Sequence, residues 1–369
     1  MHLVYLSPVP WASFAQRPHK FVEWFHARHC GEVLWVDPYP TRLPKIGDFR
    51  WEKSTVVVGG TSPAELPHWL RVVQPRALPI EPLPGVGSLN RFLWRHLLNQ
   101  VDQFLNKPDG LIGIGKPSTL ALQILIRHQE VPSFYDAMDD FPAFYEGLSR
   151  QAMERHESAV ASKVSKILVS STALAERFDC HKSKVLMALN ACATEMLPSE
   201  QLISSSTVKP ILGYVGTIGH WFDWPLVFAL ANANPMALIR LIGPVYSPAP
   251  EELPPNIELL PPCNHAMALR AMQSFSVGLI PFKQTDLTAS VDPIKYYEYR
   301  ALGLPVVSTY FGEMTLREQQ SGVFLMSRQS DLTGVVARAL EYQSNKNEIQ
   351  KFRNENSWGA RFDACGLFC

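Results

Sequence analysis

Lys295 and Glu298 are two residues whose types and spacing suit a binding site in this chain of 369 residues. Three positions separate them, so both side chains lie on one face if the segment is helical. A lysine in the first turn of a helix can bind phosphate, because free N–H groups and the helix dipole also favour an anion there. A carboxylate one turn further can bind sugar hydroxyls. The pair therefore suits a nucleotide-sugar, and an ordinary surface ion pair is the alternative.

The flanking residues predict how this pair is positioned. Asp292 followed by Pro293 is typical of a helix start, with the aspartate as the capping side chain. Gly303 supplies a residue that tolerates the left-handed conformation at a helix end. The apolar runs 277–282 and 304–308 predict buried parallel strands before and after the helix. The helix start should then lie at the carboxyl edge of a parallel sheet, where open α/β sheets bind ligands.

Three carboxylates, Asp136, Asp139 and Asp140, follow a predicted strand that ends near Tyr135. Acids this close together repel one another, so one of them can keep a raised pKa and act as a general base. In a sugar transfer with inversion, such a base takes the proton of the attacking hydroxyl. We place Asp139 and Asp140 ahead of Asp136 as the catalytic candidates. The alternative is that an aspartate here caps the next helix.

The pattern P-x-K-x-x-E-Y-x-A-x-G-x-P-V-V-S at residues 293–308 resembles the donor segment of GT-B glycosyltransferases. It is most similar to group 1 (family 4) and its bacterial exopolysaccharide relatives. The resemblance implies an α/β protein with two Rossmann-like domains facing a cleft and a C-terminal helix that crosses back to the first domain. Members usually carry a second glutamate eight positions before Glu298, where this chain has Ser290.

The order of predicted strands supports two such domains. Apolar runs at 3–6, 32–37 and 55–60 predict the first strands, and the alternation of strands and helices restarts at 211 after a serine-rich segment at 198–207. We therefore predict an N-terminal acceptor-binding domain at 1–197 and a C-terminal nucleotide-sugar domain at 208–345. Residues 346–369 form the returning helix in this prediction.

The resemblance also implies which residues bind the donor. Gly216 and Thr217 lie in the glycine loop after strand 211–215, which passes under the donor phosphates and sugar in the family, and Gly243 belongs to an Ile-Gly-Pro turn. Lys295 would stabilise the leaving diphosphate, and Glu298 would bind the ribose hydroxyls. The predicted donor set consists of Gly216, Thr217, Gly243, Lys295, Tyr296 and Glu298.

The acceptor side is less strongly marked in the sequence. The long loop after the first strand resembles the acceptor loop of GT-B enzymes, which makes Arg17 and His19 acceptor candidates, although such residues also cap helix starts. Retaining family-4 enzymes often have a histidine at the end of the strand at 110–114, where this chain has Gly115. The next residue, Lys116, is a further candidate for a phosphate or sugar contact.

Composition excludes several other classes. Lys+Arg and Asp+Glu both total 34, so a nucleic-acid partner is not expected. Six scattered cysteines without a C-x-x-C pair indicate reduced thiols in the cytoplasm rather than a zinc site. No leader peptide or membrane span is predicted. A helix at about 89–105, capped by Ser88, interleaves basic and aromatic residues and could dock on the cytoplasmic face of the membrane.

These observations predict a hexosyltransferase that uses a nucleotide-diphosphate sugar, with UDP as the expected nucleotide, and no metal or other cofactor. Its acceptor would be a saccharide or a polyprenyl-linked saccharide in polysaccharide biosynthesis. Two alternatives share the architecture: a nucleotide-sugar epimerase of the GT-B type, and a catalytically inactive subunit that binds a partner transferase or the membrane.

Overall fold

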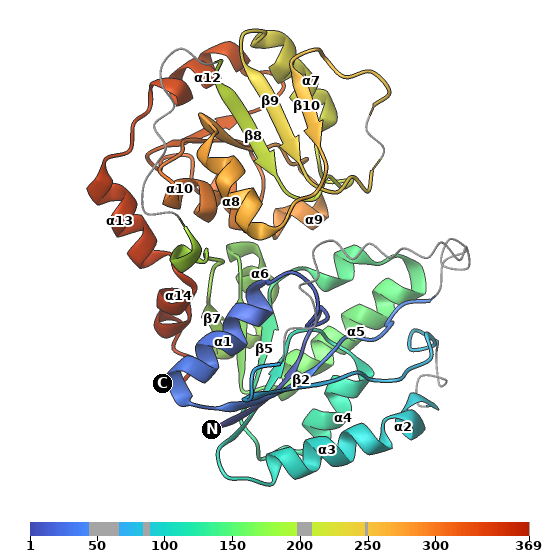
Figure 1. Cartoon of the computed structure of the whole chain (residues 1–369). Coiled ribbons are helices and arrows are strands. Elements are labelled where there is room, and N and C mark those ends of the chain that lie inside the picture. The colour runs from blue at the N-terminus through green and yellow to red at the C-terminus, as the bar shows by residue number, and fades with distance from the viewer. Residues whose placement is uncertain (44–65, 84–88, 198–208, 248–249, 369) are drawn as a thin grey trace. The chain divides into compact units, whose positions relative to one another are not determined.

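Parallel strands form one sheet in each of two units of the chain (Figure 1). The structure, a computed structural model, describes residues 1–43, 66–83, 89–197, 209–247 and 250–368. Unit 1 comprises residues 1–188 and 362–369, and unit 2 comprises residues 189–361. The division at 188 precedes the predicted one, and residues 346–361 group with unit 2 rather than unit 1. The predicted linker at 198–207 and the predicted strand at 55–60 lie outside the described residues, and so does Ser88.

The sheet of unit 1 has seven described strands in the order β3-β2-β1-β4-β5-β6-β7, all parallel. They are β1 His2–Leu6, β2 Glu32–Val36, β3 Leu70–Val73, β4 Gly110–Ile114, β5 Ser133–Ala137, β6 Lys166–Val169 and β7 Val185–Met187. The strand order reverses direction between β1 and β4. In open parallel sheets, ligands bind outside the carboxyl ends of strands at such a point.

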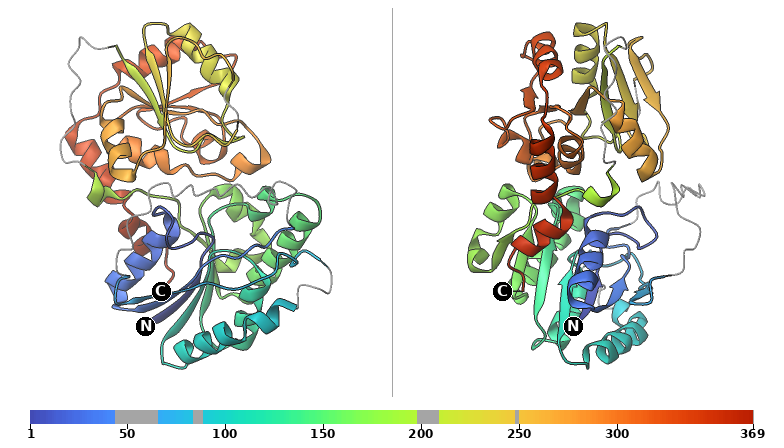
Figure 2. Two further views of the ribbon diagram at one scale, coloured as in Figure 1. Left: turned by 45° about the vertical axis from the view of Figure 1, so that its right-hand side comes forward. Right: turned by 60° about the vertical axis from the view of Figure 1, so that its left-hand side comes forward.

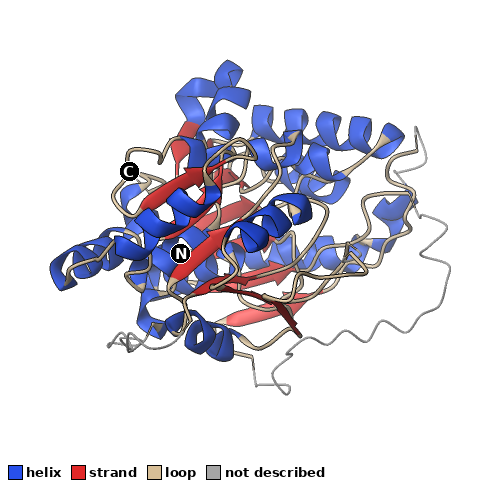
Figure 3. Ribbon diagram, turned by 90° about the horizontal axis from the view of Figure 1, so that it is seen from above, coloured by secondary structure: helices blue, strands red, loops and turns tan. Residues whose placement is uncertain are grey.

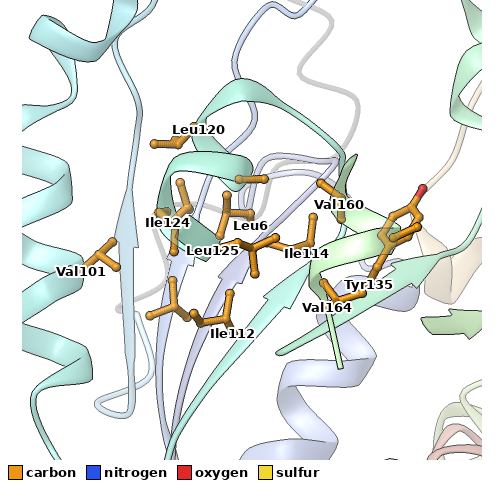
Figure 4. Packing of buried hydrophobic residues seen from close by; sticks show 14 of the residues in the cluster. Leu6, Val101, Ile112, Ile114, Leu120, Ile124, Leu125, Tyr135, Val160 and Val164 are labelled. Atoms are coloured by element: carbon orange, nitrogen blue, oxygen red, sulfur yellow. The ribbon is translucent and has the colours of Figure 1, made fainter. Parts of the chain in front are cut away.

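Helices lie on both sides of the strands, as Figure 3 shows with helices in blue and strands in red. The described helices of unit 1 are α1 Arg17–His29, α2 Asn90–Leu93, α3 Arg95–Leu105, α4 Thr119–Arg127, α5 Gly147–Lys163 and α6 Thr172–Arg177. One face packs aliphatic side chains of the strands against α3, α4 and α5, and Figure 4 shows Ile112 and Ile114 of β4 meeting Ile124 of α4. The other face is aromatic, with Tyr5 of β1 stacked on Phe21 of α1 at a centroid distance of 5.8 Å.

The sheet of unit 2 has six described strands in the order β10-β9-β8-β11-β12-β13, again all parallel. They are β8 Ile211–Val215, β9 Leu238–Ile242, β10 Ile257–Leu260, β11 Val277–Ile280, β12 Val306–Thr309 and β13 Val323–Met326. The order reverses between β8 and β11. Each strand therefore has two covered faces, which explains why the sequence shows continuous apolar runs rather than alternation.

Two helical layers enclose the sheet of unit 2. The described helices of this part are α7 Trp224–Ala233, α8 His265–Gln273, α9 Asp286–Ala289, α10 Ile294–Ala301, α11 Gly312–Thr315, α12 Leu332–Glu341 and α13 Lys346–Glu355, and α14 Trp358–Ala364 runs from unit 2 into unit 1. α7 and α12 pack on one face of the sheet, and α8 and α10 pack on the other (Figure 2).

The predicted helix at 89–105 is interrupted. It consists of α2 and α3, which meet at Trp94, and Trp94 is fully buried. Residues 70–73 form the edge strand β3. The prediction of one continuous amphipathic helix was therefore wrong at Trp94, because this aromatic side chain packs into the core rather than facing outward.

Candidate functional sites

Helix α10 begins where the sequence predicts, but its cap differs. Pro293 is the residue that precedes the first turn, and no side chain caps the helix. The carboxylate of Asp292 instead accepts hydrogen bonds from the backbone N–H of Asn190, at 2.7 Å, and the Tyr297 hydroxyl, at 2.8 Å. It also pairs with Arg317 at 2.7 Å. The capping prediction for Asp292 was wrong, because this buried carboxylate neutralises a buried guanidinium.

Lys295 and Glu298 lie together, and a histidine joins them. The Lys295 Nζ is 2.5 Å from Glu298 Oε2, and the Nε2 of His265 is 3.3 Å from Oε1 of the same carboxylate. Glu298 is buried. Burial alone would raise its pKa, but the Lys295 ammonium and the hydrogen bond from His265 outweigh this and hold the pKa of Glu298 below its usual value. His265, at the start of α8, was not among the predicted donor residues.

The glycine loop after β8 is closed by contacts that only small residues allow. A Cβ on Gly243 would lie 2.0 Å from the carbonyl oxygen of Gly216, and the φ angle of Gly243 is 149°. No other residue fits there. The Tyr214 hydroxyl donates a hydrogen bond to the carbonyl of Thr217 at 2.8 Å, which fixes the loop from below. Gly216, Thr217 and Gly243 thus follow the carboxyl ends of β8 and β9, at the reversal of strand order.

Tyr296 and Ser290 are buried, whereas Gly216 and Thr217 of the glycine loop are partly exposed. The Tyr296 hydroxyl donates to Oε1 of Gln320 at 2.6 Å, and the Arg317 guanidinium lies 4.0 Å from the ring centroid. The tyrosine is 5% exposed, so it packs inside unit 2. Ser290 is buried at the end of α9. The structure therefore places Tyr296 apart from the predicted donor surface, whereas Lys295 is partly exposed.

Unit 1 contains a cavity of about 760 Å³ at the carboxyl edge of its sheet. Loops that follow β1, β2, β4 and β5 supply most of its wall, which consists of Pro8, Val9, Gln16, Pro40, Thr41, Arg42, Pro79, Lys116, Met138, Asp139, Phe141, Phe144 and Tyr145. The cavity thus lies where the strand order reverses between β1 and β4, as expected for a ligand site in such a sheet.

The three aspartates after β5 have different surroundings. Asp136 is fully buried and pairs with Arg17 at 2.8 Å. Asp140 pairs with Arg177 at 2.6 Å. Asp139 lines the cavity, and among the residues that the structure describes its carboxylate has no hydrogen-bond or ion-pair partner.

Asp139 is accordingly the carboxyl group whose proton affinity is changed most clearly. Burial raises the pKa of Asp139 to about 7, and the negative charges of Asp136 and Asp140 act in the same direction, whereas Arg17 opposes them. A carboxylate with a pKa near neutrality can accept a proton from a hydroxyl and can later release it. Of the two catalytic candidates, Asp139 therefore lines the cavity with a raised pKa, whereas Asp140 forms an ion pair with Arg177.

Of the three acceptor candidates, Arg17 and His19 are bonded to other residues of the protein, and Lys116 lines the cavity. Arg17 donates to the carbonyl of Ala188 at 2.6 Å in addition to its pairing with Asp136. The Nδ1 of His19 accepts from the backbone N–H of Gln16 at 3.2 Å, which is the helix-start role that the sequence left open. Both side chains are buried, and neither lines the cavity. Burial also lowers the pKa of His19.

Lys116, by contrast, lines the cavity together with residues that the sequence did not single out. Gly115 before it is required, since a Cβ there would lie 2.7 Å from Pro8 and 3.0 Å from the carbonyl of Leu6. Arg42 and Tyr145 reach the same cavity from loops that follow other strands, Arg42 after β2 and Tyr145 after β5. No spacing rule could have joined them, because they follow different strands.

Near α2, apolar side chains gather on the surface of unit 1. Leu89, Phe92 and Leu93 are 50%, 63% and 47% exposed. Arg95 stands beside them, with its guanidinium 4.8 Å from the centroid of the Phe92 ring.

Within the described ranges, no helix has the length and apolar composition that crossing a membrane requires. Nor do the described residues include a group of three or more His, Cys, Asp or Glu side chains arranged to hold a metal ion.

Comparison with known proteins adds relatives at low identity. No protein-family model matches the sequence. The Bacillus subtilis protein TuaH, described as a glycosyltransferase of teichuronic acid biosynthesis, is 24% identical over 196 residues, which are 47% of this chain and 49% of TuaH. The match thus spans about half the length of this curated relative.

Solved structures match over nearly the whole chain. Sucrose-phosphate synthase from Thermosynechococcus elongatus has a TM-score of 0.65 at 14% identity and is covered over 98% of its length by 99% of this chain. Anabaena HepE in complex with UDP and glucose has a TM-score of 0.60 at 12% identity, with 100% of this chain and 99% of HepE covered. With two parallel α/β sheets and these likenesses, the chain has the GT-B glycosyltransferase fold.

Proposed function

We propose that this protein is a glycosyltransferase that moves a sugar from a nucleotide-diphosphate sugar to a hydroxyl of a saccharide or lipid-linked saccharide. The observation that carries the proposal is the cluster of Lys295, Glu298 and His265 at the start of α10. In a GT-B fold, a cation and a carboxylate one helical turn apart suit the phosphate and ribose of a nucleotide-sugar. The HepE structures, which hold UDP or UDP-glucose, support a UDP-linked donor.

In this proposal unit 2 binds the donor. The ammonium of Lys295 and the free N–H groups at the start of α10 stabilise the negative charge that develops on the leaving diphosphate. Glu298 accepts hydrogen bonds from the ribose hydroxyls. The backbone of the loop at Gly216 and Thr217 can approach the phosphates and sugar closely. A residue with a Cβ at position 243 would collide with the carbonyl oxygen of Gly216 and disturb this loop.

Unit 1 binds the acceptor in its cavity, and Asp139 is the base. The acceptor oxygen attacks the anomeric carbon as Asp139 takes the hydroxyl proton. The bond from the anomeric carbon to the diphosphate oxygen breaks, and its electron pair leaves with the diphosphate. Because one displacement occurs, the product has the opposite anomeric configuration to the donor. The configuration of the new bond, read by NMR from a product made with a donor of known anomer, tests this step.

The proposed site of action is the cytoplasmic face of a membrane. The five described cysteines are free thiols, as in a reducing compartment. The exposed side chains of Leu89, Phe92 and Leu93, with Arg91 and Arg95 beside them, suit an anionic lipid surface. We expect Phe92→Ser to reduce flotation with vesicles that contain phosphatidylglycerol. The control is Met236→Ser, which changes an equally apolar and 72% exposed residue of unit 2.

Calorimetric titration with a panel of nucleotide-sugars, with and without EDTA, tests the donor assignment. We expect one of them to bind selectively and equally well in EDTA. Lys295→Met should weaken this binding, whereas Lys346→Met, which removes an exposed lysine on α13, should not. Absence of binding across the panel would contradict the proposal and favour a non-catalytic partner subunit. Donor consumption without any acceptor, yielding an epimeric nucleotide-sugar, would favour the epimerase.

A further inference from the structure

The charges on the wall of the unit 1 cavity are unbalanced. Two cationic side chains, Lys116 and Arg42, line it, and Asp139 is the one acid among its described lining residues. Arg42 also donates to the carbonyl of Leu43 at 3.2 Å, so part of its hydrogen-bonding capacity is used within its own loop. Lys116 has no ion-pair or hydrogen-bond partner in the described part of the chain.

The buried carboxylate of Glu81 feels the charge of Lys116 but forms its hydrogen bonds with other groups. Glu81 accepts a hydrogen bond from the Tyr39 hydroxyl at 2.5 Å through one oxygen, and one from the backbone N–H of Thr119 at 3.0 Å through the other. His156 lies 3.3 Å from that second oxygen. Both oxygens of Glu81 are therefore occupied. The Lys116 ammonium keeps its hydrogen-bonding capacity for a group that enters the cavity.

The backbone holds Lys116 at this place. The close approach of Gly115 to Pro8 and Leu6 fixes the chain at the end of β4. Two residues later the hydroxyl of Ser118 accepts the backbone N–H of Ala121 at 3.2 Å and caps α4. The lysine thus stands on a short, doubly anchored segment beside a helix N-terminus, which adds positive potential to that side of the cavity.

The remaining wall suits a sugar ring. Phe141, Phe144 and Tyr145 line the cavity next to Asp139, and Phe144 is 52% exposed. Aromatic faces with a few placed polar groups are typical of small-ligand sites. Thr41 and Tyr145 share a hydrogen bond of 3.2 Å at the wall and keep polar atoms there.

We propose that the acceptor bound in this cavity is an acidic saccharide, whose carboxylate or phosphate group is held by Lys116 with help from Arg42 while its reactive hydroxyl faces Asp139. This inference rests on the proposed function, because it names the acceptor class of that reaction. A neutral saccharide would leave the Lys116 ammonium without an anionic partner inside a partly enclosed cavity, whereas an anion satisfies it with a charge-assisted hydrogen bond.

Binding of glucuronic acid, glucose 6-phosphate and glucose to the full-length protein, followed by NMR, tests the acceptor class. We expect at least one of the two anionic sugars to bind more tightly than glucose, and the preferred one tells a carboxylate from a phosphate. Lys116→Gln should weaken the anionic ligand about tenfold and leave glucose unchanged. Lys163→Gln, which removes an exposed lysine at the end of α5, is the matched control and should change neither. Equal binding of all three sugars, or equal behaviour of the two variants, would overturn the inference.

The same samples separate this inference from the donor assignment. A nucleotide-sugar titrated into Lys116→Gln should bind as it does to the wild type, and unchanged glucose binding shows that unit 1 of the variant is folded. If the nucleotide-sugar binds and the anionic sugars do not bind better than glucose, the acidic acceptor is wrong and the glycosyltransferase proposal stands. If no nucleotide-sugar binds, the donor assignment fails, while preference for the anionic sugar still reports on the cavity.

Discussion

The two candidate sites differ in whether their charged side chains are already paired with each other. In unit 2, Lys295 and Glu298 are bound to each other, and His265 contacts the same carboxylate. In unit 1, Lys116 and Asp139 line one cavity, and neither has a polar partner for its charged group among the described residues. A ligand of unit 2 must therefore share an existing ion pair, whereas a ligand of unit 1 meets charges that are still available.

This difference has an energetic consequence. A buried carboxylate such as Glu298 is tolerated because its partners offset the cost of removing it from water. Asp139 has no such partner among the described residues, and burial raises the pKa of its carboxyl group to about 7. The site of unit 2 is thus stabilised before a ligand binds, while that of unit 1 carries a group destabilised in its charged form, as catalytic groups often are.

The largest expected effect separates the two aspartates of unit 1. Asp139→Asn should lower kcat by roughly 10²- to 10⁴-fold, the usual contribution of a general base, and should preserve the fold. Asp140→Asn removes the partner of Arg177 instead, so we expect reduced stability and a much smaller loss of kcat. Steady-state kinetics and urea unfolding of both variants measure this contrast. A comparable loss of kcat in Asp140→Asn would show that the two residues act together.

In unit 2 the largest effect should fall on stability. Asp292→Asn leaves the guanidinium of Arg317 buried without a countercharge, and both side chains are at most 5% exposed. Loss of one partner of such a pair costs about 3–5 kcal/mol, to be measured as the free energy of unfolding in urea. Arg328→Gln is the control, since the Arg328 side chain is 60% exposed and its pair with Asp223 should contribute about 1 kcal/mol or less. Similar losses in both variants would show that burial does not govern these pairs.

The fold could be predicted because its signals are local. Apolar runs, Gly303 with its φ angle of 77°, and Asp223 capping α7 each act within a few residues. Lys295 and Glu298 were found for the same reason, since their contact follows from three-residue spacing. The GT-B architecture itself came from a recognised pattern rather than from these signals.

The cavity could not be assembled from the sequence, because its wall consists of loops joined only by the sheet. Asp136 is one example, because the sequence places it in one group with Asp139. In the structure Asp136 belongs to β5, and alternation along this strand turns its side chain to the face covered by α1, where it pairs with Arg17. Arg17 and His19 were acceptor candidates because their loop resembles that of GT-B enzymes. The structure buries both side chains, Arg17 against Asp136 and His19 at the start of α1, so neither lines the cavity.

A double substitution tests whether the pair in unit 2 does more than neutralise itself. Lys295→Met should lower kcat/KM by roughly 10²- to 10³-fold, as expected for the loss of one group that stabilises a developing charge. If Lys295 serves only to balance Glu298, the variant Lys295→Met, Glu298→Gln should regain activity. We expect it to remain as slow as the single variant or slower, because the diphosphate still lacks its cation. Recovery of kcat/KM in the double variant would contradict the donor role.

The pH dependence of kcat/KM and of stability should distinguish the two units. This effect is the smallest of those predicted, but it reports on individual carboxyl groups. The base form of Asp139 is needed for catalysis, so kcat/KM should fall about tenfold for each pH unit below 7 and level off above it. The contribution of Asp139 to the free energy of unfolding should instead fall as the pH rises. Because the folded-state pKa of Asp139 is raised, its contribution to stability is fully present below its ordinary value of 3.8 and is lost as the pH rises through about 7.

Asp139→Asn should therefore unfold at a slightly higher urea concentration than the wild type at pH 8, with the difference shrinking toward pH 4. Glu298→Gln supplies the opposite case, since the pKa of Glu298 is lowered. Its charge contributes stability above the ordinary carboxyl pKa, and this is lost as the pH falls through the folded value. Glu298→Gln should thus be less stable than the wild type at pH 8 and approach it in acid. Urea unfolding at pH 4 and pH 8 measures both, and the same sign in the two variants would remove the distinction between an unpaired and a paired carboxylate.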